Sequence, residues 1–116
     1  MLSVEHTVLL TVGFLPYLAL GLCDSWMHGT ARRVPVLEKI LHALVGLSLT
    51  ALWIGLLRHP GWVIPALTVF IVVGAWDELG YHSHLASRER HVHHLAYGCF
   101  AGFIVLAWAI GAVRWE

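Results

Sequence analysis

Four stretches that contain neither a charged residue nor a histidine dominate this 116-residue chain. The length of each stretch is close to the length of a helix that crosses a bilayer, which is about 20 residues. Helices satisfy their own backbone hydrogen bonds in lipid. Membrane strands would need apolar and polar residues to alternate with a period of two, and this sequence shows no such alternation. The sequence therefore predicts an all-α, integral membrane protein: an antiparallel four-helix transmembrane bundle in a single domain, 1–116. The four charge-free stretches are 7–23, 43–57, 60–76 and 95–113, and the expected helices run over about 5–28, 35–58, 61–82 and 88–114.

The composition restricts the partners that this chain can have. It is 59% hydrophobic and 12% charged, against about 45–50% and about 25% in soluble domains. A water-soluble monomer is excluded, and the expected partner is the lipid bilayer. Seven basic residues balance seven acidic ones, so no net positive field exists to attract nucleic acid, and none is expected as a partner.

The basic residues also predict an orientation. Five of the seven fall in the first and third connections or in the helix turns that directly follow them: Arg32, Arg33, Lys39, Arg88 and Arg90. Basic connections stay preferentially in the cytoplasm, so a multi-pass protein with both termini on the outer side is predicted. The first apolar stretch is not preceded by the basic segment with which a signal peptide begins, and we expect this stretch to be retained as a helix.

Nine histidines are the second unusual feature of the composition. Each expected helix has one pair of an acidic residue and a histidine at its cytoplasmic end, with the acidic residue four positions before the histidine. Residues four apart lie on one face of a helix, so each helix can present a carboxylate and an imidazole together. The pattern of helix, pair, connection, pair and helix occurs twice, which predicts a pseudo-twofold internal repeat. The pairs are Asp24 with His28, Glu38 with His42, Glu78 with His82 and Glu89 with His93.

Metal binding explains these pairs better than local helix chemistry does. An acid in the first turn offsets the helix dipole, which accounts for Glu38 and Glu89 but not for Asp24 and Glu78 near helix ends. Ionisable groups at a membrane boundary are costly and usually functional. We therefore predict that all eight paired residues bind a dinuclear centre of two divalent ions on the cytoplasmic side. The donors are chemically similar to those of di-iron and di-manganese bundles, but those use a spacing of three, so no residue roles are carried over.

Four further residues near the pairs are candidates for a third ion. They are Asp77, His84, His91 and His94. On the fourth helix, His91 and His94 point away from the face of Glu89 and His93. They can form a separate tetrahedral, zinc-like site with Asp77 or His84, and solvated loop histidines are the alternative.

The donor set favours one function and leaves others open. Mixed nitrogen and oxygen ligands suit iron, with manganese or zinc as alternatives, and the lack of sulfur ligands argues against copper(I). We predict an iron-dependent oxidoreductase that acts on a lipophilic small molecule. One alternative is a zinc- or manganese-dependent membrane hydrolase with Asp77 as the base, and another is a non-enzymatic metal carrier, sensor or store. A metal-free proton relay and a haem held by His42 and His93 also remain open.

Overall fold

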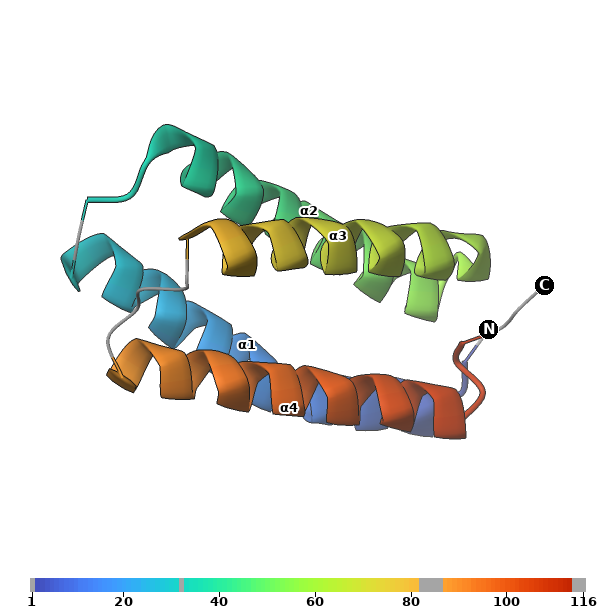
Figure 1. Ribbon diagram of the computed structural model, residues 1–116. Coiled ribbons are helices and arrows are strands. Elements are labelled where there is room, and N and C mark those ends of the chain that lie inside the picture. Colours follow the sequence, from blue (N-terminus) through green and yellow to red (C-terminus); the bar gives the residue numbers. More distant parts are fainter. Residues whose placement is uncertain (1, 32, 82–86, 114–116) are drawn as a thin grey trace. The chain divides into compact units, whose positions relative to one another are not determined.

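The computed structural model describes residues 2–31, 33–81 and 87–113, and in these ranges it contains helices and no strand. Four helices are long and apolar enough to cross a membrane (Figure 1), which confirms the predicted fold class. A short 3-10 helix, η1, precedes the third of them. The elements are α1 (Val4–Ala31), α2 (Val36–Leu57), η1 (Pro60–Trp62), α3 (Val63–Tyr81) and α4 (Ser87–Ala109).

The helix ends differ from the expected ones by three residues or more at two places. Helix α1 continues through Pro16 and ends three residues later than predicted. Helix α4 ends at Ala109, five residues earlier than predicted, because the chain turns at Ile110 and Gly111. Gly111 has a φ of 70°, which a residue without a Cβ adopts at little cost, and glycine commonly ends a helix in this way.

The helices form two compact units, and each unit is a pair of helices. One pair is α2 with α3, together with η1, and the other pair is α1 with α4. Each half of the predicted repeat therefore contributes one helix to each pair. The expected single domain over 1–116 stays a prediction.

Aliphatic side chains and one glycine hold α2 against α3. The side chains of Leu52, Leu56 and Val63 are buried. At Gly55 a Cβ would lie 3.1 Å from the backbone nitrogen of Val63, so only glycine allows α2 to approach the start of α3 this closely. The five residues from Arg58 to Trp62 connect the two helices, which makes this pair a local hairpin.

Aromatic side chains hold α1 against α4. The ring centroids of Phe14 and Phe103 lie 5.2 Å apart, and those of Tyr17 and Phe100 lie 5.1 Å apart. Because later positions on α1 contact earlier positions on α4, the two helices are antiparallel, as Figure 1 shows. The cytoplasmic end predicted for α1 therefore lies beside the beginning of α4, within one unit.

Candidate metal centre

Three side chains at one end of the α2 and α3 pair can bind a metal ion together. Glu38 and His42 lie one turn apart near the start of α2, and Asp77 lies near the end of α3. One ligand atom from each residue lies within 4.8 Å of the other two. We call Glu38, His42 and Asp77 the α2–α3 cluster.

One distance in the α2–α3 cluster matches the spacing of neighbouring metal ligands. Bonds of about 2.0–2.2 Å from a metal to nitrogen or oxygen ligands place neighbouring ligand atoms about 3.0–3.5 Å apart. The distance from His42 Nε2 to Asp77 Oδ2 is 3.0 Å. A distance of 3.0 Å also suits a hydrogen bond. The argument for a metal ion therefore depends on the convergence of all three ligand atoms and on the burial of the side chains.

The three side chains of the α2–α3 cluster differ in burial. Glu38 is 0% exposed and Asp77 is 5% exposed, whereas the side chain of His42 is 33% exposed. Removing a carboxylate from water costs several kcal/mol unless it is compensated, and a cation between two buried carboxylates supplies that compensation. The exposure of His42 gives water or a small molecule access to the cluster.

A second group of the same residue types lies in the α1 and α4 pair. His93 Nε2 lies 2.9 Å from Asp24 Oδ1, and Glu89 is buried one turn before His93 on α4. The side chains of His93 and Asp24 are 9% and 16% exposed. We call Asp24, Glu89 and His93 the α1–α4 cluster.

The two clusters contain five of the eight predicted ligands. These five are Asp24, Glu38, His42, Glu89 and His93. Glu78 is half-buried and lies outside the three-residue group that can hold a metal. The side chain of His28, together with His82 and His84, lies outside the described residues. The dinuclear centre with eight ligands therefore stays a prediction.

Asp77 is the residue whose importance the sequence pattern underrated. The spacing of four within one helix selected Glu78, whereas the structure joins Asp77 to His42 on the neighbouring helix. A signal for Asp77 does exist in the sequence. Asp24 and Asp77 each stand three residues after a glycine, Gly21 and Gly74, in the corresponding helix of each half.

The remaining histidines of α4 lie on its exposed side. His91 Nδ1 donates a hydrogen bond to the backbone oxygen of Ser87, at 2.7 Å. His94 is exposed as well. Neither residue belongs to the α2–α3 or the α1–α4 cluster, and a third ion on these side chains stays a prediction.

The chain matches no protein-family model, no curated protein and no solved structure. Its class therefore follows from the fold and the site. It is an all-α protein with four helices suited to a membrane, and one end of the α2 and α3 pair carries a Glu, His and Asp group that can hold a metal ion.

Proposed function

We propose that this protein is a membrane metalloprotein whose α2–α3 cluster binds one divalent transition-metal ion. The observation that carries the proposal is the convergence of three ligand atoms within 4.8 Å, two of them from carboxylates that are almost completely buried. A structural ion pair explains the contact between His42 and Asp77 alone.

The donor set favours iron, with manganese and zinc as alternatives. Two carboxylates and one imidazole are the ligands that these ions accept, and no sulfur ligand belongs to the cluster. An ion with four to six ligands retains open positions when the protein supplies three. Glu38, His42 and Asp77 would hold the iron, which would supply one-electron chemistry at a position that a small molecule reaches past the partly exposed His42.

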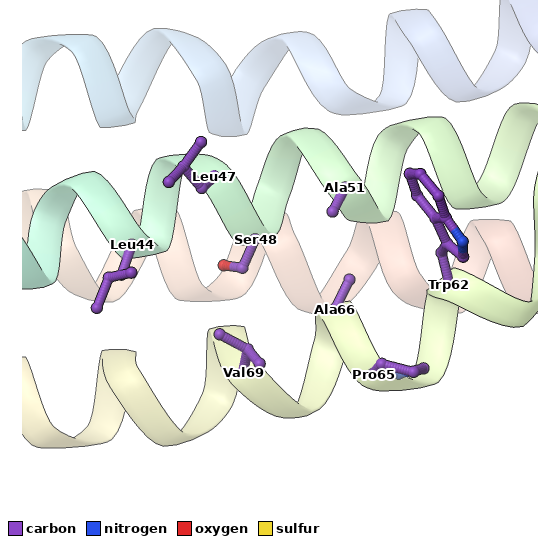
Figure 2. Close-up of a pocket in the computed structure, with 8 residues that line it drawn as sticks. All are labelled: Leu44, Leu47, Ser48, Ala51, Trp62, Pro65, Ala66 and Val69. Carbon is purple, nitrogen blue, oxygen red and sulfur yellow. The ribbon is translucent and has the colours of Figure 1, made fainter.

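A lipophilic substrate is supported by an apolar groove between α2 and α3 (Figure 2). Its volume is about 370 Å³. The groove begins at Leu44, two residues after His42 on α2, and extends along the apolar part of both helices. This lining suits a hydrocarbon chain. The lining residues are Leu44, Leu47, Ser48, Ala51, Trp62, Pro65, Ala66 and Val69.

Two structural observations bear on the alternative functions, a hydrolase and a metal carrier. A hydrolase would use Asp77 as the base beside the metal, but Asp77 belongs to the group of ligands. A carrier needs polar positions that continue along the spans, and the groove beyond the cluster is lined mainly by apolar side chains. A sensor or store would bind the same ion without turnover. We therefore favour the oxidoreductase.

The metal proposal is tested by ion binding to the full chain, purified in detergent without histidine-tag affinity. Replacing two ligands, His42→Ala with Asp77→Asn, should weaken Fe²⁺ binding at this cluster by about 100-fold or more, because loss of outer-shell partners alone costs about 10–100-fold. The matched control is Glu5→Gln, at an exposed glutamate in the first turn of α1, and it should leave this affinity unchanged. Unchanged Fe²⁺ affinity in the double variant would refute the proposal.

The redox assignment has its own test. Iron bound at the α2–α3 cluster should cycle reversibly between Fe(II) and Fe(III) in an electrochemical titration, and the His42→Ala with Asp77→Asn variant should lose the part of the signal that comes from the ion at this cluster. Bound iron that cannot be oxidised or reduced would favour a store or sensor.

We also propose that the metal end of the spans faces the cytoplasm, with both termini on the outer side. The support is the basic bias of the first and third connections. In a variant without Cys23 and Cys99, single cysteines at Ser3 and Arg33 should react with an impermeant thiol reagent from opposite sides of the membrane. Reaction of both from the same side would contradict this topology.

A further inference from the structure

The α1–α4 cluster has the same residue types as the α2–α3 cluster, and its glutamate and histidine stand at the same helix positions. In α2 and in α4 a glutamate is the third residue of the helix and a histidine is the seventh: Glu38 and His42, then Glu89 and His93. Each histidine contacts an aspartate near the end of the antiparallel neighbour, at 3.0 Å for Asp77 and 2.9 Å for Asp24. We propose that Asp24, Glu89 and His93 form a second binding site for a divalent transition-metal ion.

An independent observation at Glu89 points to a cation. Glu89 is 6% exposed, and its Oε1 atom has no hydrogen-bond partner among the residues that the structure describes. A buried carboxylate oxygen without a partner is strongly destabilising. An acid that only offsets the helix dipole would remain solvated or accept hydrogen bonds from the first backbone N–H groups. A bound metal ion gives this oxygen the partner that it lacks.

The imidazole of His93 is held from both sides. Its Nε2 atom faces Asp24, while its Nδ1 atom lies 3.3 Å from the hydroxyl oxygen of Tyr97, one turn further along α4. Histidines that bind metals usually engage their second ring nitrogen with a polar partner that fixes the ring. The position equivalent to Tyr97 on α2 is Gly46, so this support is specific to the α1–α4 cluster.

The two clusters differ in how completely their ligands converge. Among the described residues, three ligand atoms meet within 4.8 Å in the α2–α3 cluster. In the α1–α4 cluster two ligand atoms are in contact, and Glu89 lies one turn away from His93. A change of the Glu89 rotamer on ion binding would supply the third ligand. The donor set is then identical, with two carboxylates and one imidazole, so the same class of ion is expected at both sites.

The second site goes beyond the proposed function, because that function needs one ion at the α2–α3 cluster. With both sites filled, each chain binds two ions through four carboxylates and two imidazoles. That donor total equals the total in the di-metal carboxylate bundles, where two helices supply one carboxylate each and the other two supply a glutamate and histidine pair.

The test is the stoichiometry of Mn²⁺ bound to the full chain in detergent micelles, measured by equilibrium dialysis and elemental analysis. Wild type should bind two Mn²⁺ per chain. Asp24→Asn with His93→Ala should bind one, and so should His42→Ala with Asp77→Asn. The variant with all four changes should bind none. The ion that remains in each double variant also reports that the helix pair holding it is folded.

A milder variant isolates Glu89 itself. Glu89→Gln keeps the size of the side chain and removes its charge, so one of the two Mn²⁺ ions should bind about 10-fold more weakly. The matched control Glu5→Gln, at an exposed glutamate in the first turn of α1, should leave both affinities unchanged. Equal affinities in wild type and Glu89→Gln would overturn the assignment of Glu89 as a ligand.

The outcomes separate this inference from the proposed function. One Mn²⁺ per chain in wild type, lost with the His42 and Asp77 changes, overturns the second site and leaves the first in place. Two ions that persist after the Asp24 and His93 changes also overturn it, as does loss of both ions from that variant. No Mn²⁺ bound to wild type overturns the second site, and no binding of either Mn²⁺ or Fe²⁺ overturns both proposals.

Discussion

The two helix pairs are alike at one end and different along their length. The polar end has the same residue types in both pairs, with Asp77 contacting His42 in one pair and Asp24 contacting His93 in the other. Below that end, leucines and a glycine contact pack α2 on α3, whereas aromatic rings pack α1 on α4. Helix packing alone does not require the same polar residue types at one end of both pairs. The shared chemistry is therefore best explained by a shared task.

The connections differ in the same way. Helices α2 and α3 are joined by five residues, whereas 55 residues separate α1 from α4. A local hairpin forms at a lower loop-closure entropy than a pair of distant segments. Even so, both pairs place an aspartate against a histidine at about 3 Å, so this contact does not depend on how the helices are connected.

The largest expected effects come from truncating the packing of each pair. Phe103, which is 2% exposed, and Leu52, which is 1% exposed, are equivalent buried positions in the two pairs. Each change to alanine should lower the free energy of unfolding by about 1–3 kcal/mol. This is below the range for soluble cores, because lipid also solvates the separated helices and mainly the cavity term remains.

The measurement for this prediction is unfolding by sodium dodecyl sulfate in mixed micelles, followed by circular dichroism. Val105→Ala, at a side chain that is 62% exposed, is the control and should change the free energy of unfolding by less than about 0.5 kcal/mol. If Phe103→Ala is as mild as this control, the aromatic contacts do not hold α1 against α4.

An intermediate effect should distinguish the two metal clusters. Tyr97→Phe removes the hydroxyl group beside His93 Nδ1, so the ion at the α1–α4 cluster should bind about 10-fold more weakly. Binding at the α2–α3 cluster should not change, because Tyr97 has no equivalent there. Stepwise Mn²⁺ titration measures both affinities, and an equal loss at both would show that Tyr97 acts through general stability.

The smallest expected effect concerns the exposed histidines of α4. His91→Ala with His94→Ala should leave the number of bound metal ions unchanged, because neither side chain belongs to a described cluster and His91 is engaged by the backbone of Ser87. Elemental analysis of the purified variant checks this. Loss of one ion per chain would instead establish the third site that the sequence allows.

Most of the fold was predictable because charge-free length is a direct requirement of the bilayer. The helix ends were less predictable, since the end of α4 depends on the conformation of Gly111 rather than on hydropathy. The candidate ligands on α2 and α4 followed from the spacing of four within one helix. Asp77 did not, because its partner lies on another helix, and spacing within a helix carries no information about which helices pack together.

The most direct test of the metal site is X-ray absorption at the iron edge, on the Asp24→Asn with His93→Ala variant loaded with Fe²⁺. This variant retains the α2–α3 cluster. We predict a first shell of nitrogen and oxygen alone at about 2.0–2.2 Å, with the outer-shell scattering of one imidazole, from His42. A sulfur ligand at about 2.3 Å, or the absence of imidazole scattering, would contradict iron binding by Glu38, His42 and Asp77.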